Sequence, residues 1–280
     1  MWKQKLGMSV SNTYSISTAD AVRMLAKTGF EAVSFNWSSR PFLGEAVQVA
    51  KECGLMLQSL HAPYHHSNKM WNKDEEVYSI ALTELLHSLE DCHRWEIPVL
   101  VVHAWIGFGD EEGDVPTGLK NFGVLVDRAT ELGVKIAFEN TEGLKYLETL
   151  LEHFKDNSLV GFCWDSGHEM CYNGFQDLLE RFGDRLFMTH LNDNLGVSRY
   201  DGKIFWTDDL HLLPYDGVAD WNEIAERLKK AAKIPALNFE LKMDSMPDRH
   251  ENDPYVQMGV EAYFTEAYKR ACRVARKVIG

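Results

Sequence analysis

Six side chains that can bind a metal ion or transfer a proton occur at the ends of short, largely apolar segments such as LVVHAW and IAFENTEG. In chain order they are His61, His103, Glu139, Asp165, His190 and Glu240. Imidazole and carboxylate groups are common ligands of divalent metal ions, and both act as general acids or bases. The set therefore points to metal-assisted or acid–base chemistry.

Three further candidates accompany these six. His168 follows Asp165 at position i+3 in DSGH, where the chain turns through a glycine. Asp209 and His211 are two residues apart in the long segment 192–219, and an extended segment would project both to one side. Each short pair alone is also compatible with solvated loop polarity. Together with the six they give nine candidate metal ligands.

The carboxylates carry more weight than the histidines. His61 or His103 alone is also compatible with a hydrogen-bonded core residue. Glu139 and Glu240, however, are of a type that is rarely buried unless paired or metal-bound. Beside Asp165 in one cavity they would repel one another without a cation. A bound divalent ion is the simplest way to offset this repulsion between the carboxylates.

The fold must bring the ends of these segments together. Short β-branched runs alternate with longer stretches whose apolar residues recur at helical spacing. The expected strands are 6–10, 32–36, 56–61, 99–103, 135–139, 160–165, 186–190 and 236–240. Eight strand–helix units predict an α/β protein with one domain, 1–280, folded as a single (β/α)8 TIM barrel. The candidate ligands would then share the C-terminal rim of the barrel, where catalytic groups of this fold lie.

Composition excludes several functional classes. The chain has 280 residues, 45% of them hydrophobic, and a net charge of -13, which argues against nucleic acid as a partner. Its five cysteines include no CxxC pair, which argues against a disulfide framework and favours a reducing cytoplasm. A signal-peptide pattern and a membrane-spanning run are both absent from the sequence. We therefore expect a cytoplasmic protein without a membrane partner.

Residues near the expected strand ends are candidates for substrate binding. Five aromatic residues would either stack on a sugar face or seal the barrel, with Tyr64 and Trp105 the preferred substrate contacts: Trp37, Tyr64, Trp105, Trp164 and Trp206. Lys242 shares a strand face with Glu240 and would bind an anionic or hydroxylated group, or else form an outer salt bridge. The basic residues between 269 and 277 are expected on a solvated helix face.

The segments FENTEG, DSGH, HLNDN, DDLHLLPYDGVADW and FELK resemble the xylose isomerase-like metal-dependent barrels. That superfamily includes sugar-phosphate isomerases and epimerases, ketose 3-epimerases and the apurinic endonuclease family 2, endonuclease IV. The resemblance spans the chain from His61 to Glu240. It implies a metal-dependent enzyme, and its sugar-active and DNA-repair branches imply different reactions.

Resemblance to the ketose epimerases implies one divalent ion bound by Glu139, Asp165, His190 and Glu240. Glu139 and Glu240 would be the acid/base pair on opposite faces of the substrate, and His168 would contact a substrate oxygen. Resemblance to endonuclease IV implies a three-zinc cluster that uses all nine candidates. The acidic composition argues against that alternative, because the repair enzymes need cationic, intercalating loops.

The sequence therefore predicts a metal-dependent isomerase or epimerase of a sugar, sugar phosphate or polyol. The alternative is a multi-zinc phosphoesterase or apurinic endonuclease. Oxygen-rich ligands suit manganese and the additional histidines suit zinc, with one to three ions in all. The expected partner is the small-molecule substrate, and packing of outer helices between barrels would permit a homo-oligomer.

Overall fold

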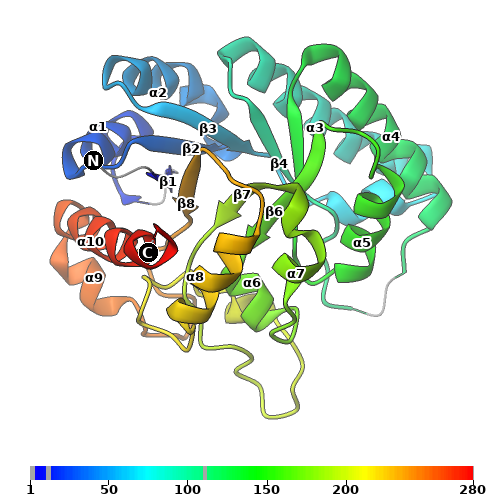
Figure 1. Cartoon of the computed structure of the whole chain (residues 1–280). Helices are drawn as coiled ribbons and strands as arrows, with labels where there is room; N and C mark the ends of the chain where they lie inside the picture. Colours follow the sequence, from blue (N-terminus) through cyan, green and yellow to red (C-terminus); the bar gives the residue numbers. More distant parts are fainter. Residues whose placement is uncertain (1–3, 11–13, 110–111, 280) are drawn as a thin grey trace.

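Eight parallel strands form the centre of the computed structural model, which describes residues 4–10, 14–109 and 112–279 (Figure 1). The strands are β1 (Lys5–Val10), β2 (Ala32–Asn36), β3 (Met56–His61), β4 (Val99–His103), β5 (Lys135–Glu139), β6 (Val160–Asp165), β7 (Leu186–His190) and β8 (Ala236–Phe239). Hydrogen-bonded neighbours run in the order β7-β6-β5-β4-β3-β2-β1-β8. The predicted (β/α)8 TIM barrel is thus confirmed.

A few contacts between β7 and β8 bring the two ends of the sheet together. Leu191 and Phe239 form an isolated parallel bridge, and the Leu191 amide donates to the Asn238 carbonyl oxygen at 2.9 Å. The Thr189 hydroxyl accepts a hydrogen bond from the Asn238 amide at 3.0 Å. These contacts bring the ends of β7 and β8, and hence His190 and Glu240, side by side.

The bounds of the strands agree closely with those predicted from the sequence. Six strands begin and end at the predicted residues, while β1 begins one residue earlier, at Lys5. The eighth strand ends at Phe239, so Glu240 lies one residue beyond it rather than within it. Its amide still donates to the Leu191 carbonyl oxygen, at 3.2 Å, which keeps Glu240 aligned with the barrel.

Helices surround the sheet (Figure 1). The α-helices are α1 (Thr18–Thr28), α2 (Arg40–Glu52), α3 (Glu75–Trp95), α4 (Val115–Leu132), α5 (Leu144–His153), α6 (Ser166–Cys171), α7 (Leu178–Phe182), α8 (Trp221–Lys230), α9 (Asp253–Met258) and α10 (Val260–Ile279). The 3-10 helices are η2 (Trp37–Ser39), η3 (Ser67–Trp71), η4 (Gly183–Arg185) and η5 (Trp206–Asp208). Among the described helices, none is long and apolar enough to cross a bilayer. All five cysteines are free thiols.

Two apolar cores follow from the alternation of side chains along the strands. A large core lies between the outer face of the sheet and the helices, and a small one consists of Val99, Val101, Ala137, Cys163 and Met188. Because successive side chains of a strand point to opposite faces, positions two residues further along point the same way. Those positions are His103, Glu139, Asp165 and His190. The inner face of the barrel therefore changes from apolar to ligand-type residues at its C-terminal rim.

The long segment from Asn192 to Ala219 is anchored by the buried carboxylate of Asp193. This carboxylate accepts hydrogen bonds from the Tyr215 amide at 2.8 Å, from the Ala219 amide at 3.0 Å and from the Trp221 indole at 2.9 Å. The backbone of Asp193 also pairs with Leu212 in an antiparallel bridge. One buried acid thus fixes both ends of the segment beside the barrel.

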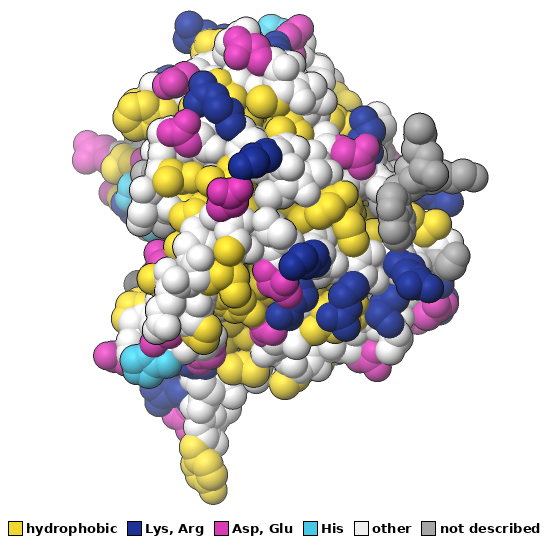
Figure 2. Space-filling model, turned by 90° about the vertical axis from the view of Figure 1, so that its left-hand side faces the viewer, with side chains coloured by type: hydrophobic (Ala, Val, Ile, Leu, Met, Phe, Trp, Pro, Cys, Tyr) yellow, Lys and Arg dark blue, Asp and Glu magenta, His cyan; other side chains and the backbone are white. Residues whose placement is uncertain are grey.

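The C-terminal helix α10 contacts the same segment. Arg270 donates to Asp216 at 2.6 Å and to the Pro214 carbonyl oxygen at 2.7 Å, while the Arg273 guanidinium lies 3.9 Å from the centre of the Tyr215 ring. The prediction of a solvated basic face was wrong for Arg270, which is largely covered, whereas Arg273 is exposed as predicted. On the face shown in Figure 2, Lys and Arg side chains are interspersed with Asp and Glu.

Candidate metal centre

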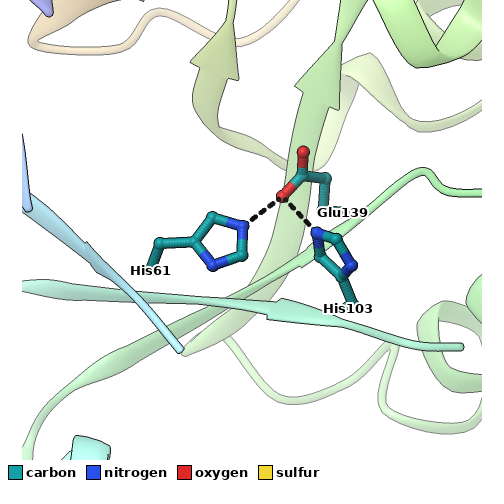
Figure 3. A group of neighbouring side chains, drawn as sticks. All are labelled: His61, His103 and Glu139. Atoms are coloured by element: carbon teal, nitrogen blue, oxygen red, sulfur yellow. Dashed lines mark ion pairs between the residues drawn. The ribbon is translucent and has the colours of Figure 1, made fainter. Parts of the chain in front are cut away.

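Glu139, at the end of β5, lies at the centre of a first group of possible metal ligands. His61 from β3 and His103 from β4 converge on its Oε2 atom, with Nε2 atoms at 3.2 and 3.4 Å (Figure 3). Glu139 is fully buried, and Oε2 lacks a hydrogen-bond donor among the described residues. The three side chains come from neighbouring parallel strands, as predicted.

A second group shares Glu139. It contains Glu139, Asp165, His190 and Glu240, whose ligand atoms all lie within 4.8 Å of one another. His190 Nδ1 is 3.0 Å from Oε1 of Glu139 and 3.0 Å from Oε2 of Glu240. Glu240 is the accessible member, with 21% of its side chain exposed. The four predicted ligands of a single ion are therefore together.

Asp165 is oriented by its neighbours. It caps α6 by accepting a hydrogen bond from the His168 amide at 2.7 Å. The Asn192 side chain donates to both of its carboxylate oxygens, and the Asn140 side chain accepts from its amide at 2.8 Å. Asn140 directly follows Glu139 in FENTEG, and Asn192 follows His190 by two residues in HLNDN. The sequence reasoning missed both asparagines.

A third group lies where the long segment crosses the rim. His168 Nε2 is 3.4 Å from Oδ1 of Asp209, and His211 Nε2 is 2.9 Å from Oδ2. The ligand atoms of these three residues also lie within 4.8 Å of one another, close enough to bind one metal ion. Lys242 Nζ lies 3.3 Å from Asp209 Oδ2, so it faces the candidate centre. All nine predicted ligands therefore fall into three adjoining groups.

Backbone carbonyls fix the tautomers of three histidines. Nδ1 of His61 lies 2.7 Å from the Ala62 carbonyl oxygen, and Nδ1 of His168 and of His211 makes similar contacts at 2.9 and 3.1 Å. A carbonyl only accepts hydrogen bonds, so Nδ1 must donate. In the neutral ring Nε2 then presents a lone pair toward a carboxylate. Two acceptors that face each other require a proton or a metal ion between them, and metal-bound histidines commonly have this support.

A second buried carboxylate provides a comparison. Glu169 accepts hydrogen bonds from both terminal nitrogens of Arg227, at 2.7 and 2.8 Å, and from the Trp164 indole at 2.8 Å. Its charge is therefore balanced by a structural ion pair. Glu139 faces imidazoles instead, and both Glu139 Oε2 and Asp209 Oδ1 lack hydrogen-bond donors among the described residues. The donor set and these two oxygens fit divalent ions.

The pKa values show the strength of the local field. Burial opposes ionisation, but His190 and His103 hold the pKa of Glu139 well below its usual value. Burial likewise lowers the pKa of His190, yet Cys163, Glu240 and Glu139 together raise it well above normal. Despite burial, the pKa values of His61 and His168 are also raised by neighbouring carboxylates, whereas burial lowers the pKa of His103 to about 4. The carboxylates therefore favour protons on some of the histidines when no other cation neutralises them.

The predicted substrate-contact residues have different positions. The Tyr64 ring stacks on His103, with ring centres 4.9 Å apart, and so lies at the first group. Trp105 is buried and stacks on Tyr146 at 4.2 Å, which places it in the packing around the rim. Lys242 is 37% exposed and its ammonium group pairs with Asp209 at the rim.

The other aromatic candidates divide in the same way. Trp164 lies between the inward-facing Cys163 and Asp165 and therefore points outward, against Arg227. Its predicted place at the barrel top was wrong for that reason. The Trp37 indole donates to Asp91 at 3.0 Å, whereas Trp206 is 44% exposed on the long segment.

One acidic residue that the sequence reasoning did not select also lies near the rim. Glu142 follows Glu139 by three residues and accepts a hydrogen bond from the Gly107 amide at 2.6 Å. Burial raises the pKa of its carboxyl group. Its position in FENTEG was the available signal, but the pattern alone gave it no partner.

Solved structures of the same fold include a protein with a bound zinc atom and two epimerases. An IolI protein with a bound zinc atom has a TM-score of 0.75 at 18% identity, covering 98% of this chain and 99% of that one. D-Psicose 3-epimerase of Clostridium cellulolyticum, solved with D-tagatose, gives 0.72 at 15%, covering 98% and 99%. The 3-keto-D-glucoside 4-epimerase YcjR of Escherichia coli gives 0.66 at 17%, covering 91% and 99%. At these identities the similarity establishes the fold.

Sequence comparisons identify the family. The protein y4fM of Sinorhizobium fredii is 33% identical over 165 residues, which are 57% of this chain and 47% of that protein. The chain thus matches about half the length of this curated relative. The family model described as xylose isomerase-like TIM barrel matches residues 22–263, from the first helix to the last. The chain belongs to the xylose isomerase-like TIM barrel family.

Proposed function

We propose that this protein is a divalent-metal-dependent isomerase or epimerase that acts on a sugar or a related polyol. The observation that carries the proposal is the group of Glu139, Asp165, His190 and Glu240, in which four ligand atoms converge at the barrel rim. A bound ion would polarise a substrate carbonyl and stabilise the oxyanion that forms when a neighbouring proton leaves.

The two glutamates suit an acid/base pair because their surroundings differ. Glu139 is fully buried, whereas 21% of the Glu240 side chain is exposed toward the rim. Glu240 is therefore placed to exchange a proton with a substrate carbon from the open side. Glu139, or an acid relayed through its imidazole neighbours, returns a proton from the buried side. His168 and Lys242 would hold substrate oxygens.

The comparisons support this reaction class. Two of the similar structures are named as epimerases of sugars or sugar derivatives, and a third contains zinc. Manganese suits the carboxylate-rich group, and zinc suits the histidine-rich groups that flank it. We therefore propose manganese or zinc, with one to three ions, and a sugar or sugar phosphate as the partner.

A second candidate function has an observation in its favour. The three adjoining ligand groups would allow several zinc ions to act together on a phosphodiester, as in a multi-zinc phosphoesterase. The net charge of -13 opposes binding of a DNA duplex. Cleavage of an abasic-site duplex by the zinc-loaded protein would establish this function, and no binding at low salt would eliminate the endonuclease form.

A screen in deuterated water tests the main proposal. The protein loaded with manganese or zinc is incubated with ketoses, aldoses, their phosphates and their glycosides, and products are read by NMR. We expect metal-dependent conversion of at least one sugar, with deuterium at the carbon next to the carbonyl. Conversion without deuterium would indicate a hydride shift instead of proton transfer. No conversion of any sugar by protein that demonstrably holds metal would overturn the proposal.

A further inference from the structure

A row of aromatic rings leads outward from the third ligand group. The His168 ring stacks on Tyr172, with centres 5.1 Å apart, and Tyr172 meets Phe108 edge to face at 5.5 Å. Phe108 lies 5.9 Å from Phe205, which lies 5.9 Å from Trp206. We call Tyr172, Phe108, Phe205 and Trp206 the aromatic row. It is continuous with the candidate metal centre.

Exposure increases along this row. His168 is buried and Tyr172 and Phe108 are half-buried, but 41% of Phe205 and 44% of Trp206 are exposed. Each ring comes from a segment that leaves the C-terminal end of a strand: after β4, after β6 and after β7. The row therefore runs from the interior of the rim to the solvent.

The outer end of the row is held in a defined conformation. The buried Asp208 carboxylate accepts hydrogen bonds from the Phe205 amide at 3.2 Å and the Ser198 amide at 3.1 Å. Arg249 approaches the same carboxylate at 3.7 Å, and the Asn194 side chain donates to the Asp208 carbonyl oxygen at 2.8 Å. The exposed rings are thus preorganised, which lowers the entropic cost of binding a ligand.

Polar groups flank the row. Gly107, which precedes Phe108, donates its amide to Glu142, so this carboxylate contacts the backbone next to Phe108. The Asp209–Lys242 pair borders the row at the His168 end. Aromatic faces that bind apolar ring surfaces, next to a few polar groups that bind hydroxyls, are what a sugar ring requires.

We propose that the aromatic row binds a second ring of the substrate, so that the preferred substrate is a glycoside rather than a free monosaccharide. The reacting sugar would lie at the metal ligands, and a second sugar ring would stack over Phe205 and Trp206. This proposal rests on the proposed function. Continuity with the metal centre and the flanking carboxylates favour a sugar over a second copy of the chain as occupant.

Calorimetric titration of the metal-loaded full chain tests the proposal with two matched probes, fructose and isomaltulose, which is the same ketose carrying a glucose ring. We expect isomaltulose to bind about tenfold more tightly, the effect of one well-stacked ring. Trp206→Ala should remove most of that difference and leave the affinity for fructose nearly unchanged. Phe205→Ala should likewise reduce the difference in affinity between isomaltulose and fructose.

Tyr200→Ala is the matched control, because Tyr200 is fully exposed on the same long segment. Figure 2 shows this segment as a narrow projection with a hydrophobic tip. The control should change neither affinity. Equal binding of both probes by the wild type, or equal losses for both in Trp206→Ala, would overturn the proposal.

Two other outcomes also decide the matter. If neither sugar binds, the glycoside proposal is overturned, and the deuterium screen decides separately whether the proposed function stands. Analytical ultracentrifugation shows whether the row is a protein contact instead. A dimer that becomes monomeric in Trp206→Ala would assign the row to an interface between copies and overturn the proposal.

Discussion

The Asn192 side-chain amide donates hydrogen bonds to both carboxylate oxygens of Asp165, at 3.2 and 3.0 Å. This contact joins the second residue after β7 to the end of β6, and it orients a candidate metal ligand from outside the ligand set. Space for it is provided by Gly167, where an added Cβ would lie 1.9 Å from Asn192 Oδ1. The glycine of DSGH is therefore part of the support of the site.

Gly167→Ala tests that support. The new methyl group must displace Asn192, so we expect a loss of about 1–3 kcal/mol in the free energy of unfolding. Loss of the hydrogen bonds to Asp165 should also weaken metal binding by roughly tenfold or more. Thermal unfolding and metal titration measure the two effects. Gly123→Ala in α4 is the control, because its Cβ would meet nothing within 4 Å, and it should stabilise the protein slightly. Unchanged metal affinity in Gly167→Ala would contradict the assigned role.

Glu240→Gln tests the acid/base pair. The amide keeps the shape of the side chain but removes the proton acceptor, so turnover of the substrate found by screening should fall about 10²–10⁴-fold. Because Glu240 is partly exposed, the fold should remain intact, as measured by circular dichroism. Glu226→Gln, on the outer helix α8, is the control and should leave turnover unchanged. Wild-type turnover by the Glu240→Gln variant would remove Glu240 from the mechanism.

The barrel and the convergence of the candidate ligands could be predicted because both depend on a short-range rule. Alternation along each strand fixes which residues face inward, and Glu139 or His190 then follows two positions after an inward Ala137 or Met188. The same rule, applied to Trp164, would have predicted its outward orientation. The alternation along β6 therefore indicates the direction of each side chain as well as the position of the strand.

Contacts between distant segments could not be predicted in this way. The pairing of Arg270 with Asp216 joins residues 54 positions apart, and nothing local in either segment indicates it. Sequence likewise gives no means of separating Glu169, which is neutralised by Arg227, from Glu139, which faces imidazoles. That distinction depends on the charge that the tertiary fold brings to each carboxylate.

Elemental analysis of protein purified without an affinity metal tests the ligand groups. We expect at least one manganese or zinc ion per chain, and we expect Asp165→Asn to lower the content by about one ion, because it weakens the four-ligand group. His250→Ala is the control, since that exposed histidine pairs with Asp253 away from the nine ligands. A second or third zinc ion that is lost in His211→Ala would place an ion in the third group. Equal metal content in wild type and Asp165→Asn would contradict the proposed centre.

The response of the metal-free protein to pH follows from its charged ligands. Burial lowers the pKa of His168, but Asp165 and Asp209 raise it well above normal, and His190 behaves similarly. When the folded-state pKa of a histidine exceeds its unfolded value of about 6.5, the histidine makes its full contribution to stability below about pH 6.5. This contribution is lost as the pH rises through the folded-state pKa.

Melting temperature should therefore fall above about pH 6.5 in protein treated with a chelator. A bound ion takes the place of these protons, so the alkaline fall should be smaller in metal-loaded protein, and binding should release protons that a pH indicator detects. At acidic pH the melting temperature depends on Glu139, whose pKa is depressed in the folded protein. Its contribution to stability is lost as the pH falls through the folded-state pKa. Melting curves with and without metal between about pH 2 and pH 9 measure both sides. The expectation would be contradicted if metal-free and metal-loaded protein had the same alkaline melting profile and if adding manganese or zinc released no protons. Protons and metal ions would then not compete for the histidines.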